Sequence, residues 1–240
     1  MKSKITFLFS FVLKAFSVLL LVFLTTGSAF GQFNIGVSAG RNYTNVFVKN
    51  VHNVFGWEEY EVTNPIHKKG FHIGVVGEYG IDNNFAVQSG IIFAMQGYKA
   101  AQKDIVVGDI KGHEVEIKVN INYLQIPVNA QYKMSLGRGA LLFQTGPYFG
   151  FALGGKMTSQ LIGNGVPVSE KKKTDLSFGG KKEQLSPFDF GIGFGIEIPL
   201  DGIQFGLRYQ LGIANLYNVE DVKMKNRGFE IKLAYYFSRK

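Results

Sequence analysis

The sequence contains no cysteine, has only six prolines, and shows no stretch with apolar residues at sustained helical spacing. Without cysteine the chain forms neither a disulfide framework nor an N-terminal lipid anchor on a cysteine, and nothing supports a cytosolic redox or zinc role. Glycine and phenylalanine, in contrast, are frequent, with 30 and 22 residues in a chain of 240. This composition predicts one all-β unit.

Acidic residues are in the minority, and the formal net charge is +8 at pH 7. Lys2, Lys4 and Lys14 lie in an N-terminal segment that we expect to be removed, so the net charge of the mature chain is near +5 (8 minus 3). The positive residues are not gathered into one basic aromatic stripe, which argues against a nucleic-acid partner. We also predict no cofactor and no metal site.

The N-terminus has the pattern of an export signal. Lys2 and Lys4 precede an apolar stretch, and "TTGSAFGQ" offers the small residues Ala29 and Gly31 before Gln32. A retained membrane helix is the alternative, but the apolar run after Lys14 is shorter than the roughly 20 residues that a span needs. We therefore expect a signal peptide at 1–31 and a mature domain at 32–240.

The stretch "FDFGIGFGIEIP" at 188–199 places Phe or Ile at every second position and Asp, Gly or Glu between them. A period of two puts these sets on opposite faces of a strand. A Gly-rich second face is unusual for a strand that meets water, and it indicates a crowded, curved interior. The spacing is not a dinucleotide fingerprint, because Ile196 stands where the third glycine belongs.

Similar alternation predicts eight strands, at 33–43, 70–80, 85–98, 120–134, 140–154, 188–199, 203–213 and 227–237. Three connections, "IDNN", "SLGRG" and "LDG", have tight-turn compositions. They alternate with four long connections, 44–69, 99–119, 156–185 and 214–226. Strict alternation of short and long connections is typical of a barrel in an outer membrane.

The predicted fold is therefore all-β, an eight-stranded antiparallel up-and-down transmembrane β-barrel with its apolar face toward lipid. A lipocalin-like soluble barrel is the alternative, but its outer face would carry Lys, Glu and Thr. Eight strands leave a narrow lumen. Inward parity predicts a polar network in this lumen, formed by Glu78, Glu197, Arg208, Glu230 and Lys232.

Two long connections carry candidate interaction residues. The first contains Phe55, Trp57 and Tyr60 beside three glutamates, a mixture suited to an aromatic anchor with a polar rim. The third contains Lys171, Lys172 and Lys173, which suit anionic lipopolysaccharide or a protein partner, although a charge run is also typical of a solvated, mobile loop.

Several segments, "FNIGVSAGRNYTNV", "GFHIGVVGEYGIDNNFAVQSGIIFAMQG", "INYLQIPVNAQYKM", "FQTGPYFGFALGGK" and "NRGFEIKLAYYF", resemble the PorT-like outer-membrane β-barrel proteins of the Bacteroidota. The resemblance covers essentially the whole mature chain. It implies an eight-stranded barrel, delivery by the barrel-assembly machinery, and a secretion-system or surface protein as a candidate partner, since the family's namesake is linked to type IX secretion. No residue with a known secretion role is matched here, and "SRK" follows the terminal Phe237.

Three function classes follow: a structural or interaction barrel acting through its long loops, a narrow channel, and a small outer-membrane enzyme. His52, His67, His72 and His113 are the only histidines, and no recognisable motif joins them to Ser or Asp. An eight-stranded interior is normally filled by side chains. We therefore favour the interaction barrel, predict no enzymatic activity, and expect the protein in the outer membrane.

Overall fold

The computed structural model describes residues 33–49, 66–107, 110–181, 184–218 and 222–237, and the side chains of Lys49 and of 102–113 lie outside that description. Its strands are β1 (Phe33–Lys49), β2 (Ile66–Gly80), β3 (Phe85–Val107), β4 (Ile110–Leu136), β5 (Gly139–Gly163), β6 (Val166–Pro167), β7 (Lys172–Asp175), β8 (Phe188–Leu200), β9 (Ile203–Gly212) and β10 (Lys223–Tyr236). The described residues contain no helix that is long and apolar enough to cross a membrane.

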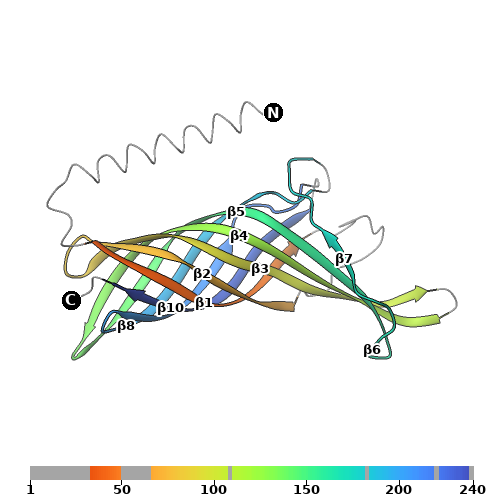
Figure 1. Cartoon of the computed structure of the whole chain (residues 1–240), viewed down its shortest axis with the longest axis horizontal. Coiled ribbons are helices and arrows are strands. Elements are labelled where there is room, and N and C mark those ends of the chain that lie inside the picture. The colour runs from red at the N-terminus through yellow and green to blue at the C-terminus, as the bar shows by residue number, and fades with distance from the viewer. Residues whose placement is uncertain (1–32, 50–65, 108–109, 182–183, 219–221, 238–240) are drawn as a thin grey trace. The chain divides into compact units, whose positions relative to one another are not determined.

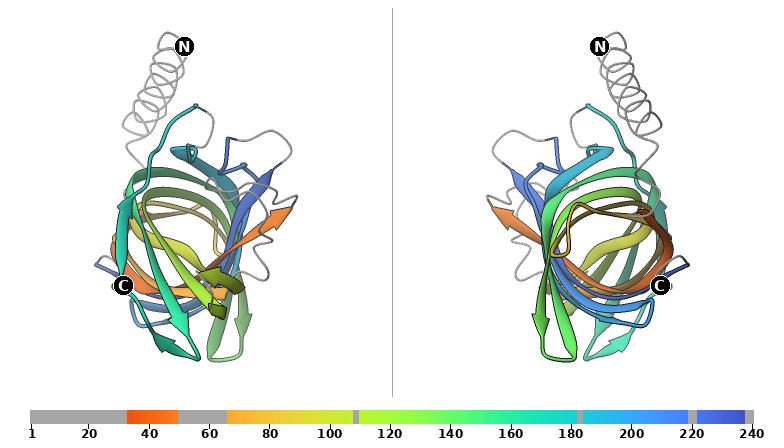
Figure 2. Two further views of the ribbon diagram at one scale, coloured as in Figure 1. Left: turned by 90° about the vertical axis from the view of Figure 1, so that its right-hand side faces the viewer. Right: turned by 90° about the vertical axis from the view of Figure 1, so that its left-hand side faces the viewer.

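Eight of these strands close into a ring. Neighbours run in the order β4, β3, β2, β1, β10, β9, β8, β5, and a β4–β5 pairing closes the circle. The pairs β1–β10, β4–β5, β5–β8 and β8–β9 are antiparallel, and the end-on views in Figure 2 show the strands surrounding one lumen. The predicted eight-stranded up-and-down barrel is confirmed; β6 and β7 are short additions that pair with β5.

The short turns lie together at one end of the barrel. In the first, the side chain of Asp82 accepts hydrogen bonds from the backbone N–H groups of Asn84 and Phe85, both at 2.7 Å. In the last, Asp201 and Gly202 both have positive φ (41° and 86°), the backbone that an Asp-Gly hairpin turn favours. We call this the turn end and the opposite end the loop end.

The strands are longer than predicted at the loop end. The segment 99–119, predicted as a long connection, is mostly strand: β3 runs to Val107 and β4 starts at Ile110, with Lys99 paired to Lys118. Figure 1 shows this hairpin and β5 continuing beyond the other strands. The prediction was wrong because the alternation of bulky apolar residues with glycine stops there, while backbone pairing with β5 continues.

Candidate functional site: the lumen and its mouth

The inward face of the barrel is mostly polar toward the turn end. Gln88, Asn129, Gln144, Gln204 and Glu197 are all at most 4% exposed. Asn129 lies at a junction: its Nδ2 donates to Gln88 Oε1 (3.1 Å) and Gln144 Oε1 (3.4 Å), and its Oδ1 accepts from Arg208 Nη2 (3.2 Å). These bonds join β3, β4, β5 and β9 in one network.

Two other hydrogen bonds cross the lumen between strands that are not neighbours in the ring. Gln96 on β3 donates to Gln210 on β9 (3.1 Å), and these strands lie four places apart in the ring in either direction. Gln88 on β3 reaches the Tyr236 hydroxyl on β10 at 2.7 Å. Side chains from different parts of the wall are therefore in direct contact at two levels of the lumen.

Glycines make room for these large polar side chains. Lys232, Gly206 and Glu197 are register partners across β10, β9 and β8. Because Gly206 has no side chain, Lys232 reaches past it to form an ion pair with Glu197. A Cβ on Gly206 would lie 2.6 Å from Cγ of Glu197, and one on Gly193 would lie 2.3 Å from Nε of Arg208.

The five residues proposed from sequence as a lumen network are all buried and face the lumen, but they do not form one cluster. Lys232 pairs with Glu197, which also accepts from Gln144. Arg208 bonds Asn129 and is the cross-strand neighbour of Glu230. Glu78 accepts from Gln204 at 3.0 Å. Gln144 and Asn129 connect Glu197 to Arg208, so a pattern restricted to ionisable residues misses much of this network.

Sequence reasoning also missed a second polar group nearer the loop end. Asp189, at 0% exposure, accepts from Asn226 Nδ2 (2.9 Å) and from the Tyr148 hydroxyl (3.2 Å). His72 donates from Nδ1 to Asn42 Oδ1 at 2.6 Å. The inward parity of Asp189 and His72 was readable from the sequence, but their partners were not, because these lie on strands far away along the chain.

An apolar cap closes the loop end of the lumen. Inward residues of four strands pack against the connections that follow β7 and β9, and the buried members are Val46, Tyr98, Ala100, Val119, Ile121, Tyr123, Leu185, Leu216, Tyr217, Val222 and Met224. The backbone N–H of Leu216 bonds Met224 O (2.8 Å), and that of Ser186 bonds Leu216 O (2.8 Å). Burial in this cap raises the pKa of the Tyr98 phenol.

The predicted loop residues have different outcomes. Phe55, Trp57 and Tyr60 lie outside the described residues, as does the proposed signal peptide at 1–31. Lys171, Lys172 and Lys173 are exposed. The segment was expected to be a mobile loop, but Lys172–Asp175 forms β7, with Lys173 opposite Thr158 of β5. Backbone pairing with the long β5 holds this segment as a strand, which its lysine-rich composition does not predict.

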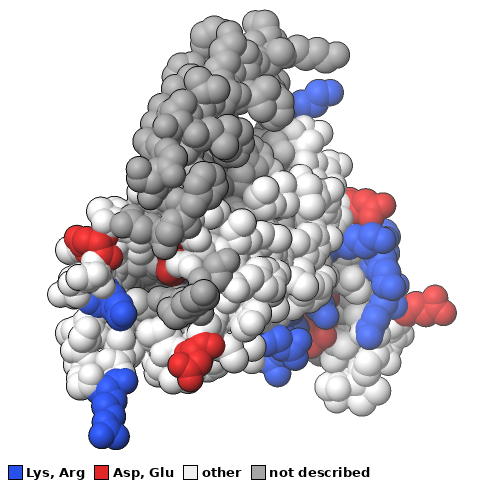
Figure 3. All heavy atoms as spheres, turned by 60° about the vertical axis from the view of Figure 1, so that its left-hand side comes forward, with Lys and Arg blue, Asp and Glu red and all other residues white. Residues whose placement is uncertain are grey.

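The outer wall is apolar, and aromatic rings pair along it. Tyr209 and Phe229 lie 4.6 Å apart between ring centroids, and Phe85 and Tyr132 lie 5.1 Å apart. Figure 3 shows a broad uncharged area on the side of the barrel, with the charged residues mostly beyond it. Such a belt, about 25 Å tall in barrels of this class, is the surface that meets lipid.

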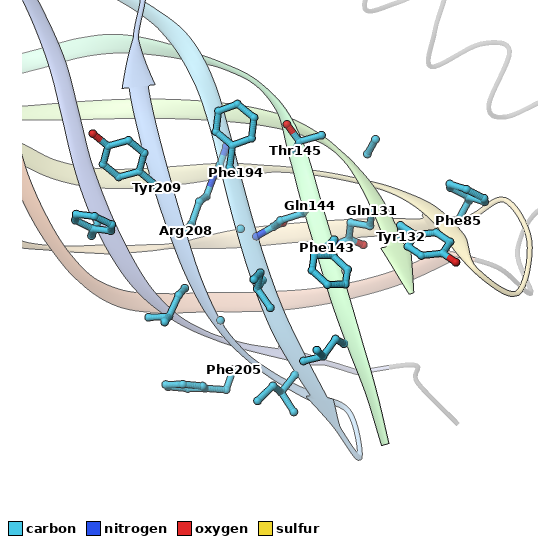
Figure 4. Close-up of a pocket in the computed structure, with 18 residues that line it drawn as sticks. Phe85, Gln131, Tyr132, Phe143, Gln144, Thr145, Phe194, Phe205, Arg208 and Tyr209 are labelled. Carbon is cyan, nitrogen blue, oxygen red and sulfur yellow. The ribbon is translucent and has the colours of Figure 1, made fainter. Parts of the chain in front are cut away.

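A hollow of about 850 Å³ lies in this wall, over β4, β5, β8 and β9. Figure 4 shows Phe143, Phe194, Phe205 and Tyr132 around it, and its lining also includes the inward-facing Gln131, Gln144 and Arg208. Its apolar position within the lipid-facing belt suits acyl chains. The described residues contain no group of three or more acidic or histidine side chains placed to hold a metal ion.

A closed ring with an apolar outer belt and a polar lumen defines the class of integral outer-membrane β-barrels. The family model described as "Outer membrane protein beta-barrel domain" matches residues 26–218, so the chain belongs to this family and is an outer-membrane protein. No curated protein sequence matches it.

Solved structures similar to the chain include three barrels. OprG from Pseudomonas aeruginosa is 13% identical, with 87% of this chain and 97% of that one covered and a TM-score of 0.41. Neisserial surface protein A is 12% identical, with coverages of 85% and 97% and a TM-score of 0.38. Ail of Yersinia pestis, in complex with the heparin analogue sucrose octasulfate, is 13% identical, with coverages of 85% and 98% and a TM-score of 0.37.

Proposed function

We propose that the protein is a closed barrel that acts as a structural or interaction protein through the surface at its loop end. The observation that carries this proposal is the double closure of the lumen. Hydrogen bonds such as Gln96–Gln210 cross it, and Leu185, Leu216 and Tyr217 from the connections pack into its mouth. Because described residues bridge the lumen and pack into its mouth, the outer loops and strand extensions are the parts we assign to a partner.

The remaining features of the proposal come from the sequence. A signal peptide ending at Gly31 would direct export, and the barrel-assembly machinery would insert the mature chain. Within its family we place the protein among the PorT-like barrels, on the segments quoted above. A secretion-system or other surface protein is then the expected partner of the first loop, and lipopolysaccharide the expected contact of Lys171–Lys173. Nothing in the lumen geometry supports an enzyme or a nucleic-acid partner.

A narrow channel is the second candidate, because the lumen lining of Gln, Asn and charged side chains also suits water or a small polar solute. The apolar cap argues against it, since a solute would have to displace packed connections. Two pockets lie at the turn end: one of about 550 Å³ has a lining that includes the turn residues 137–140 and 201–202, and one of about 170 Å³ is lined by Glu78 and Gln131.

The experiment compares two shortened variants in a deletion strain. Replacing residues 50–65 by a tight turn removes Phe55, Trp57 and Tyr60 but leaves Val46 in the apolar cap. We expect a folded, heat-modifiable barrel at normal surface abundance that no longer complements the strain or captures its partner after crosslinking. Shortening 169–183 should have the weaker effect. Full activity of the first variant at normal abundance would move the function into the barrel wall or lumen.

A further inference from the structure

The pocket of about 170 Å³ at the turn end is lined by residues of β2, β3, β4 and β5 and by the turn between β2 and β3. Two small residues leave this space open. Gly80 of β2 and Ala86 of β3 are register partners at this level, and both line the pocket. At the next level of the lumen the larger Gln88 and Asn129 are register partners and fill the same side of the barrel. We call this space the turn-end pocket.

Gln131 of β4 brings an amide without partners to this pocket. It is the register partner of Ala86, lines the pocket and is only 2% exposed. Neither its Nε2 nor its Oε1 has a hydrogen-bond partner among the described residues. A buried polar group that stays unsatisfied is costly, so such groups bond to protein, to water or to a ligand. Gln131 therefore offers both a donor and an acceptor to a molecule in the pocket.

Hydrogen bonds fix the rim of the turn-end pocket. Asn84 donates from Nδ2 to the backbone oxygen of Lys133 (2.9 Å), and the backbone N–H of Lys133 donates to Asn84 O (2.6 Å). The side chain of Asp82 holds the same turn from within, as described above. These bonds hold the turn against β4. A pre-formed pocket loses little free energy to ordering when a ligand binds.

The lining of the pocket favours a neutral ligand over an anion. Two carboxylates, those of Glu78 and Asp82, and one ammonium group, that of Lys133, line it, so the formal charge of the lining is −1 (1 minus 2). Glu78 also accepts a hydrogen bond from Gln204 at 3.0 Å. Leu142, at 3% exposure, adds an apolar wall. A small ligand with one polar group and one apolar part matches this lining.

The geometry of an amide narrows the choice of polar group. The N–H and C=O of the Gln131 side chain lie on one edge, so one ligand satisfies both only if it also presents C=O and N–H on one edge. A primary carboxamide does this. A trans peptide group does not, because its N–H and C=O point in opposite directions. A ketone has no donor for Oε1, and a carboxylate lacks the donor and adds a negative charge.

We propose that the turn-end pocket binds a small neutral molecule with a primary carboxamide, which pairs with Gln131 through two hydrogen bonds and places its apolar part against Leu142. In outer-membrane barrels the short turns lie on the periplasmic side, so the ligand would come from the periplasm. The inference goes beyond the proposed function, because it concerns the opposite end of the barrel. It needs neither a loop partner nor a closed lumen, so each of the two can fail without the other.

The test uses the mature chain (32–240) refolded in neutral detergent, with NMR titrations that follow the backbone amides of Gly80 and Ala86. The probes are isobutyramide, 3-methyl-2-butanone and isobutyrate, which have the same shape and differ in the polar group. We expect isobutyramide to bind about tenfold more tightly than the ketone, and isobutyrate to bind more weakly than isobutyramide. Equal binding of amide and ketone would overturn the pairing with Gln131, and tighter binding of isobutyrate would identify an anion site instead.

Three variants locate the binding. Gln131→Met removes the donor and the acceptor and should lose the preference for the amide over the ketone. Gln125→Met is the matched control, because Gln125 is buried on the same inward face of β4 but does not line the pocket, and it should retain the preference. Ala86→Leu fills the pocket and should weaken the binding of isobutyramide. Equal losses in the Gln131 and Gln125 variants would overturn the site.

Thermal stability gives an independent reading, with the temperature of heat-modified migration as the measurement. Heat replaces urea here, because urea itself carries the carboxamide group. Without ligand, Gln131→Met should be at least as stable as wild type, since it removes two buried groups that lack partners. Isobutyramide should stabilise wild type but not Gln131→Met. A clearly lower stability of Gln131→Met would show that the fold already satisfies this amide, and it would overturn the proposal.

Discussion

At the scale of single residues, the lumen depends on pairing glycine with a large polar neighbour. Gly193 faces Arg208, Gly195 faces Gln144, and Gly206 faces Glu197; a Cβ added to any of these glycines would lie 2.3–2.7 Å from the neighbouring side chain. Glycine in a strand normally weakens it. Here its lack of a side chain is what allows long polar groups to meet across a narrow barrel.

Substitution of Gly193 tests this complementarity. In Gly193→Ala the new methyl must displace the guanidinium of Arg208, which loses its bond to Asn129. We expect a loss of about 0.5–1.5 kcal/mol in the free energy of unfolding, because the flexible end of Arg208 can move aside but gives up its hydrogen bond to Asn129. Urea titration of the refolded barrel measures it. Gly139→Ala is the control, because its Cβ would have only Leu136 O, at 3.9 Å, within 4 Å. Equal stability of both variants would contradict the packing described.

The Lys232–Glu197 pair gives a second prediction at this scale. Glu197 is 0% exposed, so Lys232→Met leaves a carboxylate buried without its cation. Removing one partner of a buried ion pair typically costs about 3–5 kcal/mol. The double variant Lys232→Met/Glu197→Gln should recover most of this loss, because no unpaired charge remains. A double variant as unstable as Lys232→Met, in the same urea titration, would show that the pair is not the origin of the effect.

At the scale of the strands, the alternation of residues determines which side chains face lipid. Their depth in the membrane determines how much a charged substitution costs. Outward residues of β9, such as Phe205 and Leu207, are largely exposed, whereas the inward Gln204 and Arg208 are buried. On β5 the outward row passes from Phe151 and Leu153 to Lys156 near the loop end. The same substitution should therefore have different costs at the middle and at the edge of the belt.

Two arginine substitutions test this dependence on depth. Leu207 and Leu153 are similarly exposed, at 58% and 61%, but Leu207 lies within the belt and Leu153 at its loop-end edge. We expect Leu207→Arg to cost about 2–4 kcal/mol and Leu153→Arg about 0–1 kcal/mol. Unfolding in lipid vesicles is the measurement. A larger penalty at Leu153 would place the membrane elsewhere on the barrel.

The sequence predicted the strands well where they cross the membrane, because a lipid-facing wall and a narrow lumen impose opposite chemistry on alternate residues. Beyond the belt the rule reverses: Tyr98, Val119 and Ile121 are apolar and inward, while Lys99 and Lys118 are charged and outward. That reversal resembles loop composition, so the extension of β3 and β4 was missed. The partners of the lumen charges were unpredictable because they depend on how the ring is staggered.

At the scale of the whole molecule, the barrel has a polar interior closed twice. The hydrogen bonds Gln88–Tyr236 and Gln96–Gln210 cross the lumen at two levels, and the apolar cap packs at the loop end. Closure there fixes the connections after β7 and β9, while the lysines of β7 remain exposed. This arrangement supports the proposed interaction barrel over the alternative of a narrow channel.

The most direct test of this account is the conductance of the purified, refolded protein in planar lipid bilayers. We predict no large steady conductance from wild type, because facing side chains such as Gln96 and Gln210 are in contact and Leu216 and Tyr217 fill the mouth. Heat-modifiable migration of the same sample confirms that the barrel has folded. Regular, porin-sized openings from folded wild-type protein would contradict the closed lumen and establish a channel instead.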